Sequence, residues 1–225
     1  MRNTIVTLFI VMLAAVGFAQ NDITKELGEF SEVKAFDGIS VKLINSTENK
    51  AIIKGKNKND VEIVNKNGKL KVRMDISEAF DGYNTFVELY HSSPIYLIDA
   101  NEQAFIENVD PSEVTEIILR AQEGGEISVY LNVERVEIKA VTGGNIETRG
   151  TANTQDVTIN TGGEYDGKDL NTKQSYVSVS AGGEAVIYAT EYVEAEVRAG
   201  GDIDVYGDPK VIDKKTFLGG RIKEY

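Results

Sequence analysis

The chain of 225 residues contains no cysteine and a single histidine, His91. Without cysteine it forms no disulfide and has no thiolate nucleophile, so its stability must come from packing and backbone hydrogen bonds. One histidine without cysteine does not make a histidine-rich zinc site, and nothing in the sequence predicts a nucleophile–base pair around it. We therefore interpret His91 as an ordinary loop residue.

Basic residues are also scarce, because 24 Lys and Arg stand against 36 Asp and Glu, for a net charge of −12. Nucleic acid and anionic membrane surfaces both attract basic patches, which this chain has little charge to supply. Beyond residue 20, no apolar run approaches the roughly 18 residues of a spanning helix. We expect no nucleic-acid partner and no membrane span in the mature chain.

The N-terminus has the three parts of a secretory signal peptide. Arg2 supplies the positive start, Ile5–Ala15 is a short apolar run, and Gly17–Ala19 has the small residues of a cleavage site. Residues 1–19 are therefore predicted to be a signal peptide. The mature protein would be exported to the periplasm, the cell surface or the extracellular space.

Glycine pairs dominate the second half of the chain and recur at a nearly constant spacing. Successive first glycines are 19, 19, 20, 18 and 19 residues apart, a period typical of a stacked repeat. The pairs are Gly124-Gly125, Gly143-Gly144, Gly162-Gly163, Gly182-Gly183, Gly200-Gly201 and Gly219-Gly220.

Aligning the repeats on the first glycine predicts two short strands in each coil. The fourth and sixth positions and two columns of the second strand are mostly apolar, so these side chains should point inward. A coil of 19 residues has a perimeter of roughly 60 Å, which fits two or three faces around a thin core. The glycines would turn the coil and allow close approach between coils. We predict an all-β fold, a right-handed single-stranded parallel β-helix.

The first part of the chain is less regular. Residues 20–35 are polar and are interpreted as a leader or a first edge strand, residues 36–94 as an N-terminal β segment or cap, and residues 95–225 as the regular coils. Within the N-terminal part, Asn67-Gly68 between two alternating runs predicts a β-hairpin. Asn101-Glu102 stands where a further glycine pair is expected.

Two outward columns are candidates for function. The third position is acidic at Glu126, Glu164, Glu184 and Asp202. This column suggests a weak divalent-cation site, a face for a basic partner, or only a solvated acidic edge. The seventh position combines tyrosines, which offer rigid amphipathic contact area, with basic residues. This tyrosine stripe consists of Tyr130, Arg149, Lys168, Tyr188, Tyr206 and Tyr225. It would either bind a partner or stabilise the sheet by cross-strand stacking.

Two other chemistries fit the sequence less well. The nonapeptide Gly162–Leu170 resembles a calcium-binding repeat, but the other coils lack its third glycine and its aspartate. Carboxylate pairs such as Asp202 and Asp204 have a spacing that glycosidases can use, but the loops between coils are too short to build a substrate groove. We predict no catalytic residues and no cofactor.

The order of several motifs resembles the "putative auto-transporter adhesin, head GIN domain" family. The similarity runs from Phe36–Val41 (FDGISV) through Asn67–Val72 (NGKLKV) and the Gly-Gly coils to Gly200–Lys210 and Gly219–Ile222. The resemblance implies a right-handed β-helix in secreted or surface proteins of Bacteroidetes-type bacteria, with an adhesive role and no established catalytic residues.

These observations favour a non-catalytic interaction protein of the cell envelope that binds a glycan or a protein through its flat faces. A carbohydrate-active β-helix enzyme and an envelope scaffold are the alternatives. The last coil has no second strand after Gly219-Gly220, and such an open edge must be covered or paired. A homo-oligomer is therefore a further expectation.

Overall fold

The computed structural model describes residues 22–225, and the predicted signal peptide at 1–19 lies outside them. The first nine strands are β1 (Ile23–Glu26), β2 (Glu32–Ala35), β3 (Ser40–Asn45), β4 (Lys50–Gly55), β5 (Val61–Lys66), β6 (Lys69–Met74), β7 (Thr85–His91), β8 (Leu97–Ala100) and β9 (Phe105–Asn108). The next eight are β10 (Glu116–Gln122), β11 (Glu126–Val141), β12 (Asn145–Asn160), β13 (Glu164–Ser180), β14 (Glu184–Arg198), β15 (Asp202–Tyr206), β16 (Val211–Phe217) and β17 (Arg221–Glu224). Two short 3₁₀ turns, Lys58–Asp60 and Ile76–Glu78, complete the described elements.

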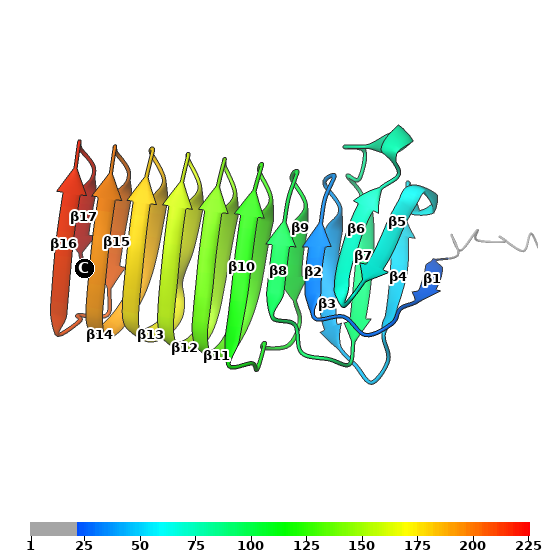
Figure 1. Cartoon of the computed structure of the whole chain (residues 1–225), viewed down its shortest axis with the longest axis horizontal. Helices are drawn as coiled ribbons and strands as arrows, with labels where there is room; N and C mark the ends of the chain where they lie inside the picture. Colours follow the sequence, from blue (N-terminus) through cyan, green and yellow to red (C-terminus); the bar gives the residue numbers. More distant parts are fainter. Residues whose placement is uncertain (1–21) are drawn as a thin grey trace, which may run out of the picture.

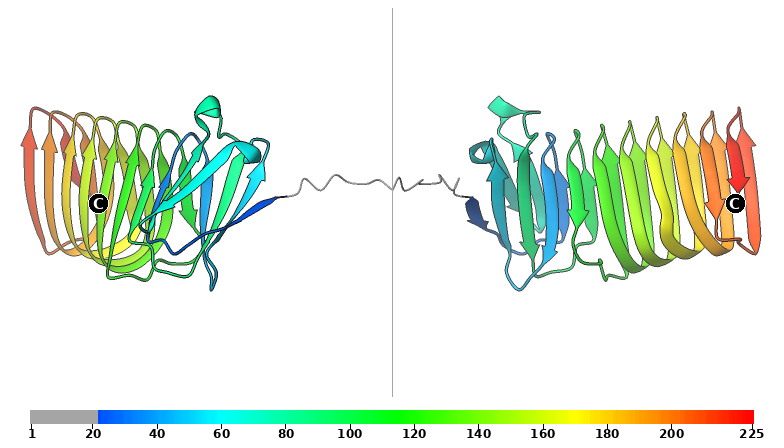
Figure 2. Two further views of the ribbon diagram at one scale, coloured as in Figure 1. Left: turned by 45° about the vertical axis from the view of Figure 1, so that its right-hand side comes forward. Right: turned by 180° about the vertical axis from the view of Figure 1, so that it is seen from behind.

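The strands stack side by side along the long axis of the molecule, which confirms the predicted parallel β-solenoid (Figure 1). Ile127 pairs with Ile146 and Ile138 pairs with Val157, so successive coils are one repeat apart and parallel. The two strands expected in each coil are one continuous strand that bends around a corner (Figure 2). In β11 the inward–outward alternation breaks at Glu134 and Arg135, which are both exposed. One half of each long strand therefore lies on each face of the flattened coil.

Apolar side chains fill the space between the two faces. Their columns are those that the repeat alignment predicts. One face contributes Ile127, Ile146, Tyr165, Ala185 and Ile203, and the other contributes Leu119, Ile138, Val157, Val177 and Ala195, all nearly inaccessible to solvent. Burying each of the larger aliphatic side chains contributes about 1.5–3 kcal/mol, so this thin core is the main source of stability.

The first glycine of each pair has a positive φ, a conformation that costs energy for residues with a side chain. At the first regular turn, Glu123 and Gly124 have φ of 55° and 74°, and the Gly125 N–H donates to the Gln122 carbonyl at 2.9 Å. Two successive positive φ values define a type I′ turn, which suits the twist of the strands that it joins. The glycine supplies one of these two residues without strain.

The second glycine of each pair has a different role. A Cβ on Gly144 would lie 2.2 Å from the carbonyl oxygen of Ala121 in the preceding coil, and one on Gly125 would lie 2.2 Å from that of Ala100. By contrast, a Cβ on Gly143 would meet nothing within 4 Å. The second glycine is therefore required because neighbouring coils approach closely at the turn.

The N-terminal strands are stacked out of sequence order. β2 lies between β6 and β8 on one face, and β3 lies between β7 and β9 on the other. The predicted hairpin forms between β5 and β6, with φ of 54° at Asn67 and 78° at Gly68. β5 on one face, and β4 with β1 on the other, run antiparallel and cover this end of the solenoid (Figure 1).

Of the two interpretations of residues 20–35, the leader is wrong from Ile23 on. β1 is an edge strand that pairs only with β4 among the described strands, whereas β2 lies within the sheet. Val33 and Ala35 of β2 are fully buried, while the alternate residues Glu32 and Lys34 face outward. The polar outer positions concealed this strand in the sequence. The turn that replaces a glycine pair also lies two residues later than the predicted Asn101-Glu102. The turn residues are Glu102 and Gln103, with φ of 50° and 62°, so Gln103-Ala104 takes the place of Gly-Gly.

Charged side chains lie at the inward positions of the last coil. Lys214 is in register with buried Ala195, and Glu224 is in register with buried Val205. These two residues form an ion pair across the end of the core. Inward-pointing charges of this kind are a common protection for an unpaired sheet edge.

Candidate functional site

The predicted tyrosine stripe is present on the surface as two clusters. At one end, the Arg149 guanidinium lies 5.7 Å from the centre of the Tyr130 ring. At the other, the Lys168 ammonium lies 4.3 Å from the Tyr206 ring, which in turn stacks on Tyr225 with centroids 4.9 Å apart and an interplanar angle of 9°. These cation–π and stacking contacts order the side chains, and Tyr130 and Tyr225 remain 39% and 60% exposed.

The interval between the two clusters coincides with the irregular repeat lengths. The coil that begins at Gly162 has 20 residues and the next has 18, whereas their neighbours have 19. Arg149 consequently pairs with Asp169 instead of Lys168, and the register shifts again on both sides of Thr172. β-Bulges of this kind re-aim side chains and are frequent beside functional sites.

Buried polar side chains compensate for this irregularity inside the core. The carbonyl oxygen of Tyr188 accepts hydrogen bonds from the Thr172 hydroxyl at 2.6 Å and from Gln155 Nε2 at 3.3 Å. Gln155 also donates to the Ser175 hydroxyl at 2.7 Å and accepts from the Tyr165 hydroxyl at 2.8 Å. Burial raises the pKa of the Tyr165 hydroxyl far above its usual value, so this hydroxyl remains a donor. The network holds the backbone of Tyr188 in place from beneath.

A shallow corner groove lies on the outer side of this network. Its volume is about 380 Å³, and Tyr188 of the stripe forms part of its wall. The other lining side chains are mostly amides and hydroxyls, with one acid and one base. They are Asn132, Val133, Glu134, Thr151, Ala152, Asn153, Asn171, Thr172, Lys173 and Thr190. Thr151 donates to Asn132 Oδ1 at 3.0 Å. The two N–H groups of the Asn132 side chain are then available as donors to a ligand.

The acidic column runs across the coils in register, with Asn145 between Glu126 and Glu164. Glu164 is in register with Glu184, and Glu184 with Asp202. Arg221 of the last coil forms a two-pronged ion pair with Asp202, with Nε 3.0 Å from Oδ1. The hydrogen bond from this arginine holds the pKa of the Asp202 carboxyl below its usual value. Among residues 22–225, no group of three or more acidic or histidine side chains is placed to hold a metal ion.

Calcium is therefore expected to leave the thermal stability of the protein unchanged. Arg221 already neutralises one end of the column, and separated carboxylates provide too few of the six to eight oxygen ligands that Ca²⁺ requires. Thermal unfolding with and without millimolar CaCl₂ measures the effect, with MgCl₂ as the control for ionic strength. A saturable rise in Tm with Ca²⁺ alone would contradict this expectation.

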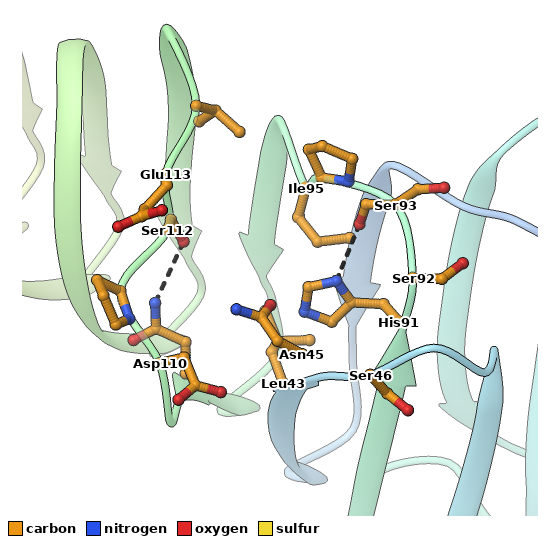
Figure 3. A pocket seen from close by; sticks show the side chains of 14 residues that line it. Leu43, Asn45, Ser46, His91, Ser92, Ser93, Ile95, Asp110, Ser112 and Glu113 are labelled. Atoms are coloured by element: carbon orange, nitrogen blue, oxygen red, sulfur yellow. Dashed lines mark hydrogen bonds between the residues drawn. The ribbon is translucent and has the colours of Figure 1, made fainter.

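A second cavity, of about 540 Å³, lies at the corner of the N-terminal half (Figure 3). Here three loops replace the continuous strand that rounds the corner in the later coils (Figure 2). The loops follow β3, β7 and β9. His91 lies in this loop cavity, and its Nδ1 is 2.9 Å from the Ser93 carbonyl oxygen. Burial lowers the pKa of the imidazole, against opposing effects of Ser93 and Asp110.

Sequence reasoning placed the tyrosine stripe and the acidic column but missed the groove and the cavity. The 20- and 18-residue steps and the polar inward residues Thr148 and Gln155 were signals of the groove. No comparable signal existed for the loop cavity. Its walls come from three segments that only the out-of-order stacking brings together.

No helix long and apolar enough to cross a membrane occurs in residues 22–225.

Solved structures share this fold at low sequence identity. A "putative adhesin" from Bacteroides fragilis NCTC 9343 superposes with a TM-score of 0.79 at 16% identity, over 92% of this chain and 98% of that one. A "putative adhesin" from Parabacteroides distasonis ATCC 8503 gives 0.72 at 15% identity, over 91% and 96% of the two chains. A "putative lipid binding protein" from the same strain gives 0.63 at 16% identity, over 92% and 98%. These likenesses show the fold alone.

No curated protein matches the chain. A family model, however, matches residues 29–209, which is most of the sequence. It begins just before β2 and ends just after β15, so it includes the stripe except Tyr225, together with the corner groove and the loop cavity. The chain therefore belongs to the family described as "Putative auto-transporter adhesin, head GIN domain".

Proposed function

We propose that this protein is a non-catalytic, adhesin-like interaction protein of the cell envelope that binds a glycan along the tyrosine stripe and the corner groove. The observation that carries the proposal is the position of Tyr188, which belongs to the stripe and also lines a groove rich in amides and hydroxyls. An aromatic ring beside several amide and hydroxyl groups offers an apolar surface and multiple hydrogen bonds to the same ligand. Sugar rings present both kinds of surface.

The geometry also favours a ligand that runs along the solenoid axis. Asn132, Thr151 and Asn171 are directly in register, so the groove presents one amide or hydroxyl per coil. Coils are spaced by about 4.8 Å. A sugar unit in an extended chain advances by a similar distance. A linear oligosaccharide would therefore place successive units over successive coils.

Family membership and the adhesin neighbours support a surface or envelope location, and we propose export through the N-terminal signal peptide. A non-catalytic role agrees with the position of the single histidine. Its Nδ1 faces the Ser93 carbonyl, and no nucleophilic hydroxyl is hydrogen-bonded to its ring among the described residues.

Replacing Tyr188 and Tyr206 together by alanine is expected to weaken glycan binding at least about tenfold, since stacked aromatic contacts contribute much of the energy at such surfaces. Binding to an immobilised panel of acidic and neutral envelope polysaccharides measures the effect. Thermal unfolding of the same variant verifies that it is folded.

The other face provides a matched control. Tyr176 and Tyr192 form a tilted ring pair there, with centroids 5.7 Å apart. Alanine at both of these positions should leave the affinity unchanged. Equal losses in the two double variants, or no binding of the wild type to any glycan in the panel, would refute the proposal.

A further inference from the structure

The loop cavity has the chemistry of a ligand site separate from the corner groove. It adjoins one end of the stripe, because Asn108 in its wall donates to the Tyr130 carbonyl at 2.9 Å. Its volume of about 540 Å³ lies within the 300–1,000 Å³ typical of small-molecule sites. Its apolar side chains are Leu43 of β3 and Ile95 and Val114 of the loops; Leu43 and Ile95 are nearly buried in the floor, and Val114 is partly exposed. These side chains form a surface that an aliphatic chain can contact.

Three polar groups of the cavity can only accept hydrogen bonds, namely one His91 ring nitrogen and the carboxylates of Asp110 and Glu113. A carbonyl oxygen only accepts, so His91 Nδ1 donates to Ser93, and Nε2 is left as an acceptor. In Figure 3 this side of the ring faces Asn45, whose amide has no hydrogen-bond partner among the described residues. Because burial keeps the imidazole neutral at neutral pH, the ring adds an acceptor and no positive charge.

The net charge of the cavity is negative. Asp110 and Glu113 stand on the loop after β9, and neither carboxylate takes part in a hydrogen bond or ion pair within residues 22–225. None of the residues that line the cavity is lysine or arginine. The two carboxylates would repel an anionic ligand and attract a cation, which could also contact the neutral ring nitrogen.

We infer that this cavity binds a primary ammonium group on an aliphatic stem. The ammonium would lie among His91 Nε2, Asn45 and the Asp110 carboxylate, and the stem would contact Leu43, Ile95 and Val114. An ammonium has three donors and no acceptor, which complements His91 Nε2, the Asn45 side-chain oxygen and the Asp110 carboxylate. Both a lysine side chain of a partner protein and a free alkylamine present this chemistry.

The test is an NMR titration of the ¹³C/¹⁵N-labelled chain, following the His91 ring and Asn45 side-chain signals. n-Butylamine is the cationic probe, and n-butanol has a similar stem without the charge. n-Butylamine is expected to shift these signals saturably and to bind at least about tenfold more tightly than n-butanol, because the charged group is the main source of affinity. Equal binding of the two probes would overturn the inference.

A pair of matched variants separates the site from the general charge of the protein. Asp110→Asn with Glu113→Gln should weaken n-butylamine binding at least about tenfold. Glu123→Gln with Glu191→Gln changes the net charge equally at two exposed positions that do not line the cavity, and it should have little effect because distant charges are screened. Similar weakening in both variants, or in neither, would also overturn it.

Comparison with Nα-acetyl-lysine methylamide distinguishes the two sources of the ammonium. Tighter binding of this compound than of n-butylamine would identify the occupant as a lysine of a protein partner. Tighter binding of n-butylamine would identify it as a free amine. Both results support an ammonium site, and neither depends on glycan binding at the stripe.

Discussion

Gly144→Ala is expected to destabilise the protein by at least about 3 kcal/mol, whereas Gly143→Ala, one residue earlier, should cost about 1 kcal/mol. The added Cβ at position 144 would lie 2.2 Å from the Ala121 carbonyl oxygen and 2.4 Å from its carbon, both backbone atoms of the preceding coil. Relief of this overlap requires the two coils to separate at the turn, which weakens their ladder of hydrogen bonds. At position 143 the only penalty is the positive φ of 72°.

Urea unfolding of both variants measures the two free energies. The pair is its own control, because the two substitutions are chemically identical and share one turn. Similar losses at both positions would mean that the turn conformation alone matters. The result would then contradict the role assigned to the second glycine of each pair.

Gln155→Leu is expected to reduce the free energy of unfolding by about 3 kcal/mol or more. The substitution keeps the volume of the side chain but removes the acceptor for the Tyr165 hydroxyl and the donor to the Ser175 hydroxyl. Tyr165 keeps Thr148 as a partner and Ser175 keeps Thr172, but all four hydrogen bonds of the Gln155 side chain are lost. Each contributes about 0.5–1.5 kcal/mol. Chemical denaturation followed by far-UV circular dichroism provides the measurement.

Two further variants make this prediction specific. Gln174→Leu, at an outward position next to Ser175, should change stability by no more than about 0.5 kcal/mol. Gln155→Val combined with Ser175→Val makes the whole column apolar, as at Val136 and Val193, and should recover part of the loss because both partners are removed together. If the double variant loses as much stability as Gln155→Val and Ser175→Val lose separately when added together, the two side chains are not coupled.

The regular half of the fold was predictable because sequence neighbours there are also spatial neighbours. When coil follows coil, the spacing of the glycines fixes the register, and the register fixes which side chains point inward. Ile127, Ile146 and Ile203 could therefore be assigned to the core from spacing alone, and the structure confirms that they are buried. The same logic placed Tyr188 and Tyr206 on an outer surface.

In the N-terminal half, strands that are neighbours in the sheet are far apart in the sequence, so the repeat period does not predict their pairing. β2 contacts β6 and β8, which are tens of residues away, so no fixed step in the sequence relates them. The loop cavity has the same origin, since Asn45, His91 and Asp110 are adjacent only in space. Their juxtaposition follows from tertiary stacking that local patterns do not encode.

The position of β2 and β3 between later strands has a consequence for the order of folding. The regular coils can add one after another as the chain becomes available, because each needs only the coil before it. β2 and β3 obtain both of their neighbours only when the chain is available as far as Asn108. The first half of the molecule therefore has to close as one long-range unit, and contacts of such wide sequence separation form slowly. We expect this closure, and not the growth of the repeats, to limit the rate at which the protein reaches its native state.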